Sequence, residues 1–394
     1  MTIRCVLGDY LCLYQSYVQA DRPPCCKLDA VVPLSSRRCC SIVKYDAVVP
    51  LSSLAKRDLS WFVNKSRLYN GTKLIKPTKV ITLTTDASLS GWGAVSDVGV
   101  TNGIWSQEEK AQHINWLELT AIWLGVQCFV LTSYCYIKVF CDNGSAVAYI
   151  NNMGGSCPNL HSVASQIWQW CIDRSCVIEA FYIPGRLNIR ADSLSRGHQQ
   201  NLEWKLHPTV FRWISQSYFT PGIDLFASRL NHQVADYASW QPDPGAVAED
   251  AFSLNWVGTK PYFFPPFSLI GRVLTKMKRD QVADAIIIAP WWPTAHWYPM
   301  LVHRIFSRPL LLPQWKQLLL HPGNKDMLHP LWQTIRLAAW RVSALDSKVE
   351  DFQKGLPSTC SSLGVQAPQS SIPQHGSVSV AGVVRGRKIL FKRL

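Results

Sequence analysis

The segment from 78 to 198 alternates strand-like and helix-like stretches, and this order constrains the fold more than any other feature of the chain. The predicted strands are short, β-branched or apolar stretches bounded by turn residues: 81–85, 91–96, 103–106, 136–141 and 177–183. The predicted helices are 114–130, 143–152, 158–174 and 191–195, with Asn115 as the N-cap of the first. A three-stranded meander followed by alternating helices and strands predicts an α/β fold with a mixed five-stranded sheet and flanking helices.

Four acidic residues mark the ends or beginnings of these stretches. Asp86 ends the first predicted strand, Asp142 follows the fourth, and Asp192 opens the last predicted helix. Glu118 lies in the otherwise apolar helical stretch WLELTAIW, where burying an unpaired carboxylate is costly. Taken singly, each acid has an ordinary alternative as a turn residue or a solvated helix residue. Together they predict a two-metal site, because clustered carboxylates are the usual way to hold Mg²⁺ ions for phosphodiester hydrolysis.

The composition fits a folded protein that acts on a polyanion. Hydrophobic residues make up 47% and charged residues 17%, which supplies enough apolar material for cores and excludes global disorder. The net charge of +14 favours a nucleic-acid substrate, although basic charge can also serve solubility alone.

The cysteines and the apolar runs bear on the compartment. The 13 cysteines form no CxxC pair and no Cys/His zinc spacing. An N-terminal apolar run is broken by Asp9, and no apolar run is long enough to span a bilayer. We therefore expect an intracellular protein of the cytoplasm or nucleus, not a secreted one.

Four sequence blocks carry a family resemblance that covers roughly residues 80–198: TTDASLSGWGAV, LELTAI, VFCDNGSAVAYIN and IPGRLNIRADSLSR. They resemble the motif blocks of retroelement ribonuclease H domains, especially those of DIRS-type (tyrosine-recombinase) retrotransposons. The resemblance implies cleavage of the RNA strand of RNA–DNA hybrids with two Mg²⁺ ions, Mn²⁺ being an alternative ion. It implies that Asp86 and Asp142 are central ligands, that Glu118 binds one ion, and that Asp192 completes the other site.

The same resemblance suggests residues for substrate contact. Ser88, Asn143 and Ser145 follow the predicted metal ligands and are candidates to read the 2′-hydroxyl groups that distinguish RNA from DNA. Three arginines flank Asp192 and are candidates to hold phosphates, with a solvated surface as the alternative: Arg186, Arg190 and Arg196. The chain departs from many cellular members, which carry a histidine in the loop before the last acid. This loop has Asn188 and no histidine.

A second α/β unit is predicted over 199–345, with buried parallel strands at 222–227 and 283–290 and an amphipathic helix at 269–280. It resembles the region after ribonuclease H in the same retroelements and, more distantly, Dam-like adenine methyltransferases, which implies a Rossmann-like fold. By that resemblance Asp224 would bind the cofactor. Phe264, however, stands where those enzymes carry the acceptor for the adenine amino group, and a phenyl ring cannot accept that hydrogen bond. We therefore expect a scaffold without S-adenosylmethionine.

The predicted organisation has four parts. Residues 1–77 are expected to be a poorly ordered remnant of the connection to reverse transcriptase, and they contain the octapeptide DAVVPLSS twice, at 29–36 and 46–53. The ribonuclease H-like domain spans 78–198, the methyltransferase-like domain 199–345, and a flexible basic tail 346–394. Since no YxDD-type polymerase motif occurs, we expect a truncated retrotransposon copy. The alternatives are an inactive nucleic-acid-binding remnant and, less favoured, an adenine-N6 DNA methyltransferase.

Overall fold

The computed structural model describes Ser53 and residues 76–197, 204–358 and 380–394. The duplicated octapeptide lies outside the described residues except for Ser53, and so does nearly all of the predicted segment 1–77. Within the described residues, no helix is both long enough and apolar enough to cross a membrane.

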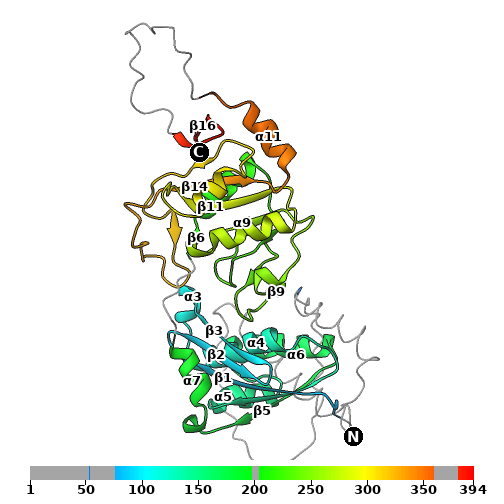
Figure 1. Ribbon diagram of the computed structural model, residues 1–394. Helices are drawn as coiled ribbons and strands as arrows, with labels where there is room; N and C mark the ends of the chain where they lie inside the picture. The colour runs from blue at the N-terminus through cyan, green and yellow to red at the C-terminus, as the bar shows by residue number, and fades with distance from the viewer. Residues whose placement is uncertain (1–52, 54–75, 198–203, 359–379) are drawn as a thin grey trace, which may run out of the picture. The chain divides into compact units, whose positions relative to one another are not determined.

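The first sheet has five strands in the order β3-β2-β1-β4-β5 (Figure 1). The strands are β1 (Val80–Ala87), β2 (Gly91–Ser96), β3 (Gly99–Ile104), β4 (Tyr136–Cys141) and β5 (Val177–Tyr182). The strands β1, β2 and β3 form an antiparallel meander, and β1, β4 and β5 are parallel. The predicted mixed five-stranded sheet is therefore confirmed.

The third strand begins earlier than the sequence pattern predicts. Ser96 pairs with Gly99, so the hairpin between β2 and β3 turns within two residues, Asp97 and Val98. Two-residue turns match the twist of antiparallel strands. As a result Gly99 and Gly103, which look like turn residues in the sequence, pair within the ladder.

Among residues 76–197, six helical segments accompany this sheet: α3 (Gln107–Lys110), α4 (Ile114–Phe129), α5 (Gly144–Asn151), α6 (Pro158–Asp173), the 3₁₀ turn η1 (Gly185–Leu187) and α7 (Ile189–Arg196). The N-cap of α4 is His113, whose ring nitrogen Nδ1 accepts the N–H of Asn115. The predicted N-cap at Asn115 is wrong by two residues.

Adjacent residues of β2 show that α4 and α7 cover opposite faces of the sheet. A Cβ added to Gly93 would lie 2.6 Å from the carbonyl oxygen of Ala191 in α7. A Cβ added to Gly125 in α4 would lie 3.1 Å from the Cβ of Ala94. Since neighbouring residues of a strand point to opposite faces, the two helices approach from opposite sides.

The second sheet has six strands in the order β17-β12-β14-β11-β10-β7. They are β7 (Ile223–Asp224), β10 (Pro261–Phe263), β11 (Ala285–Pro290), β12 (Leu310–Leu311), β14 (Leu337–Val342) and β17 (Lys392–Arg393). The strands β7 and β11 are both parallel to β10, which lies between them, and β14 is antiparallel to β11 and β12. The two predicted parallel strands and the helix between them, α9 (Ile270–Arg279), are present. The Rossmann-like assignment and the domain boundaries stay predictions.

The described residues also contain several short helices and strand pairs. The helical ones are α8 (Pro208–Ser217), η2 (Ala251–Ser253), η3 (Phe267–Leu269), α10 (Tyr298–Val302) and α11 (Asp346–Lys354). The strand pairs are β6 (Lys205–Leu206) with β13 (Leu319–Leu320), β8 (Ala238–Ser239) with β9 (Ala248–Glu249), and β15 (Val380–Val384) with β16 (Arg387–Leu390). The segment 346–394, which was expected to be a flexible tail, thus contains regular structure in its described residues. Ile389 and Phe391 anchor its end, because both side chains are buried in an apolar cluster.

Candidate active site

The ends of two parallel strands bring the first two carboxylates together. In the ladder between β1 and β4, Thr84 pairs with Phe140. Continuing that register by two residues places Asp86 beside Asp142, on the same face of the sheet. The strands β1 and β4 are thus parallel neighbours in the sheet.

Glu118 reaches the same place from α4. Glu118 is 5% exposed, and its Oε2 lies 3.7 Å from the Sγ of Cys141. Ligand atoms of Glu118, Cys141 and Asp142 all lie within 4.8 Å of one another. Burial, followed by the negative charges of Asp86 and Asp142, raises the pKa of Glu118 to about 9. The carboxyl of Glu118 therefore keeps its proton at neutral pH unless a cation replaces it.

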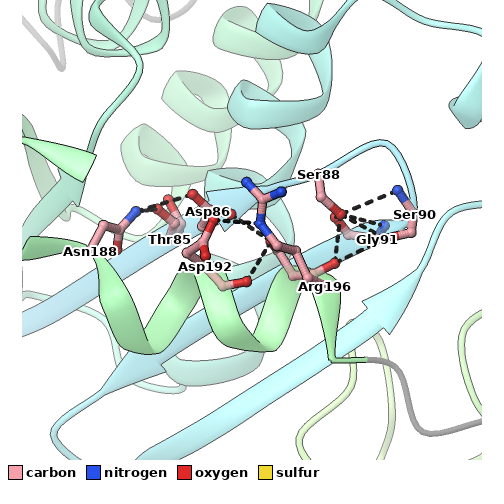
Figure 2. A network of polar contacts seen from close by, with 9 residues as sticks. Thr85, Asp86, Ser88, Ser90, Gly91, Asn188, Asp192 and Arg196 are labelled. Atoms are coloured by element: carbon pink, nitrogen blue, oxygen red, sulfur yellow. Dashed lines mark hydrogen bonds and ion pairs between the residues drawn. The ribbon is translucent and has the colours of Figure 1, made fainter. Parts of the chain in front are cut away.

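Asp86 is held by side chains from the α7 region at both of its oxygens (Figure 2). Asn188, the residue before α7, donates from Nδ2 to Oδ1 at 3.3 Å, and Ser195 donates from Oγ to Oδ2 at 2.5 Å. Burial raises the pKa of Asp86 to about 6, although the hydrogen bond from Ser195 opposes this. Asp86 is thus a buried carboxylate with a fixed orientation.

Asp192 is partly exposed to solvent. Its side chain is 40% exposed and accepts a hydrogen bond from the Nε of Arg196 at 2.6 Å, as Figure 2 shows. Its charge contributes to the raised pKa of Asp86, which places it in the same electrostatic environment.

The turn after β1 is tied to α7 through Ser88. Its hydroxyl donates to the carbonyl oxygen of Ser195 at 2.6 Å, and it accepts the N–H groups of Ser90 and Gly91. Ser88 is 9% exposed. A residue predicted to contact the substrate therefore uses its hydroxyl inside the protein, to dock α7 on the sheet.

The other predicted substrate-contacting residues differ in their surroundings. Asn143 caps α5 through its Oδ1 and donates from Nδ2 to the Oδ1 of Asn115 at 2.9 Å. Asn115 in turn donates to the Oγ of Ser145 at 3.3 Å. Sequence reasoning missed Asn115 as a site residue, although its place three residues before Glu118 put it on the same helical face. The three predicted phosphate-binding side chains are exposed: Arg186, Arg190 and Arg196.

The donors at this site fit a hard divalent cation. Carboxylate oxygens are the ligands that Mg²⁺ and Mn²⁺ prefer, and four acidic residues supply them. Asn188 offers a second observation: it is 1% exposed, and its Oδ1 accepts no hydrogen bond from any described residue. A buried acceptor without a partner is costly, and a cation-bound water would satisfy it.

No protein-family model and no curated protein matches this chain. Some solved structures do. They include LC11-RNase H1 in complex with an RNA/DNA hybrid, at 18% identity and a TM-score of 0.25, covering 29% of this chain and 91% of that one. RNase H1 from the halophilic archaeon Halobacterium salinarum NRC-1 matches at 13% identity and a TM-score of 0.21, covering 29% and 92%. A Prototype Foamy Virus protease-reverse transcriptase matches at 11% identity and a TM-score of 0.19, covering 40% and 23%.

Asp224, the predicted cofactor ligand of the second unit, lies at the end of β7 and is 2% exposed. Its Oδ1 accepts the N–H of Phe226 at 3.4 Å, and its Oδ2 accepts the N–H of Gln233 at 3.1 Å. The carboxylate therefore organises the loop that follows its own strand. This use of Asp224 fits a scaffold, and its role as a cofactor ligand stays a prediction.

Proposed function

We propose that this chain is a metal-dependent endonuclease of the ribonuclease H type, which cuts the RNA strand of RNA–DNA hybrids. The observation that carries the proposal is the meeting of three acids from separate elements. Asp86 and Asp142 end neighbouring parallel strands, and Glu118 brings a ligand atom within 4.8 Å of one on Asp142. The four sequence blocks further support an origin in a DIRS-type retrotransposon.

The residues of the site have distinct parts in this reaction. Two Mg²⁺ ions, when bound, would activate water and stabilise the leaving 3′ oxygen, and the four acids would hold them. Asn188 and Ser195 keep both oxygens of Asp86 in one orientation, so that the site does not have to reorganise when it binds. Glu118 must give up its proton to become a ligand.

The substrate would be recognised by hydrogen bonds and by charge. Asn143, Ser145 and Asn115 form one polar group beside Asp142, and we propose that it faces the minor groove and the 2′-hydroxyls. The exposed side chains of Arg186, Arg190 and Arg196 would contact phosphates. These contacts position the RNA strand over the carboxylates.

The decisive experiment is cleavage of an end-labelled RNA–DNA hybrid by the full chain with Mg²⁺. We expect Asp142→Asn to lower the rate by at least about a thousandfold, because the lost charge stood where cations must be held. The matched control is Asp173→Asn at the C-terminal end of α6, where the carboxylate accepts a hydrogen bond from the exposed Nε2 of Gln169. Hybrid binding without any cleavage by the unmodified chain would instead identify a nucleic-acid-binding remnant.

A further inference from the structure

Cys141 is a member of the carboxylate cluster that the proposed nuclease reaction does not use. It is the last residue of β4, fully buried, and its Sγ lies 3.7 Å from Oε2 of Glu118. Mg²⁺ is a hard cation that takes oxygen ligands, so a thiol contributes nothing to its binding. The sulfur is therefore a possible metal ligand that the Mg²⁺ reaction leaves unused.

The mixed set of one sulfur and two carboxylates suits a different class of ion. Zn²⁺ and Cd²⁺ bind thiolate and carboxylate together, and Zn²⁺ is most often four-coordinate. With Zn–S of about 2.3 Å and Zn–O of about 2.1 Å, neighbouring donors around such an ion are about 3.6 Å apart. The observed 3.7 Å between sulfur and carboxylate oxygen matches that separation.

A backbone group beside Cys141 is compatible with a bound ion. The backbone N–H of Asn143 donates to the Sγ of Cys141 at 3.3 Å, and this contact would stabilise the thiolate once a cation replaces the thiol proton. The site thus offers one sulfur and two carboxylates whose ligand atoms lie within 4.8 Å of one another.

We propose that Glu118, Cys141 and Asp142 form a binding site for a thiophilic divalent cation, Zn²⁺ or Cd²⁺, which displaces Mg²⁺ and inhibits the chain. The inhibitory half rests on the proposed nuclease function, whereas the binding half does not. Cys141 therefore makes the site favour such ions in a way that a serine or threonine at the same position would not.

The binding half is tested by titrating the metal-free full chain with Cd²⁺ and following the ultraviolet thiolate-to-Cd²⁺ charge-transfer absorption. We expect Cys141→Ala and Cys141→Ser each to lose the equivalent of one cadmium–thiolate bond. The matched control, Cys171→Ala, removes another fully buried thiol and should keep the signal. An unchanged signal in both Cys141 variants, or an equal loss in Cys171→Ala, would overturn the proposal.

The inhibitory half is tested by adding Zn²⁺ to the Mg²⁺-dependent cleavage reaction. The Zn²⁺ concentration for half inhibition, taken relative to each variant's own Mg²⁺ activity, should rise at least tenfold in Cys141→Ser. The same concentration for Cys141→Ser and the unmodified chain would refute competition at this site. A chain that cleaves no hybrid would refute the nuclease function and leave the cadmium titration to decide the binding.

Discussion

At the scale of single residues, the cost of burying carboxylates at the site appears as raised pKa values. Glu118 and Asp86 are both buried and both near other acids, so their pKa values are raised to about 9 and about 6. Each holds a proton in the folded, metal-free protein more tightly than in the unfolded chain. A divalent cation would compete with these protons, which links metal binding, pH and stability.

The raised pKa values predict how the stability of the metal-free chain depends on pH. Folding raises the pKa of Glu118 from 4.5 to about 9. Between these two pH values the folded state therefore binds more protons than the unfolded state. The free energy of unfolding should therefore fall as pH rises from 5 to 8, by up to about 1.4 kcal/mol per pH unit. Thermal unfolding should show this slope in the full chain and a much flatter one in Glu118→Gln. Added Mg²⁺ should restore stability mostly at the higher pH.

Ser195 is predicted to position Asp86 for the metal. Ser195→Ala removes a buried hydrogen bond to Oδ2 of Asp86 and should cost about 1–2 kcal/mol of stability. The Mg²⁺ concentration for half-maximal cleavage should rise several-fold, while hybrid binding in Ca²⁺ stays the same. The control is Ser193→Ala, an exposed position in the same helix. Identical Mg²⁺ dependence in the two variants would mean that Ser195 has no positioning role.

At the scale of elements, the site depends on α7 lying directly on the sheet. Asn188 and Ser195 hold Asp86, and Asp192 supplies the fourth carboxylate. The close approach is possible because Gly93 has no side chain. The backbone of β2 and the backbone of α7 are in contact at this point.

Gly93→Ala is therefore predicted to displace α7. The new Cβ would lie 2.6 Å from the carbonyl oxygen of Ala191 and 2.8 Å from the backbone nitrogen of Ser195, and neither atom can move without the helix. We expect a loss of about 1–3 kcal/mol in chemical denaturation and a large loss of cleavage. The control is Gly144→Ala, where nothing lies within 4 Å of the added Cβ. Equal stability of the two variants would contradict close packing of α7.

The helices and strands were predicted well where one hydrophobic periodicity dominates the local sequence. They were predicted less well where contacts with other segments set the boundary. Strands β1, β4 and β5 were predictable because β-branched and apolar runs end at turn residues or acids. The start of β3 was not, since Gly99 and Gly103 look like turn residues until their ladder partners are known. The N-cap of α4 moved to His113 because its ring nitrogen reaches the N–H of Asn115.

The candidate site was predictable only in part. Asp86, Glu118 and Asp142 stood out because strand ends and an apolar helix leave a carboxylate few harmless roles. The inward role of Ser88 was not predictable, because its bond to the carbonyl of Ser195 joins residues 107 positions apart. For the same reason, no local pattern showed that Cys141 would lie against Glu118.

At the scale of the whole molecule, the net charge of the chain and the charge of the candidate site have opposite signs. The chain carries a net charge of +14, whereas the site itself is acidic, with Asp86 and Glu118 buried. Long-range attraction to the proposed polyanionic substrate would therefore come from residues outside the carboxylate cluster, and the exposed arginines on or beside α7 are candidates.

Hybrid binding should weaken steeply with salt, and the arginines near α7 should account for part of that dependence. The triple variant Arg186→Ala, Arg190→Ala, Arg196→Ala should reduce the slope of log K against log salt by about two to three, since each phosphate contact contributes about 0.7–0.9. Fluorescence anisotropy over a salt series measures it. Arg174→Ala, an exposed arginine stacked on Trp170, is the control. A slope equal to that of the control would remove these residues from the interface.

The spacing along α7 and its N-cap residue makes the site sensitive to insertions and deletions in this helix. Asn188, Asp192 and Ser195 follow one another at intervals of four and three residues, which keeps them on one stripe. Inserting or deleting one residue would rotate everything beyond it by about 100°. Such a frame-preserving change would separate Asp192 or Ser195 from Asp86 even though every acid is retained. The length of this helix, and not only the presence of the acids, therefore decides whether the candidate site can assemble.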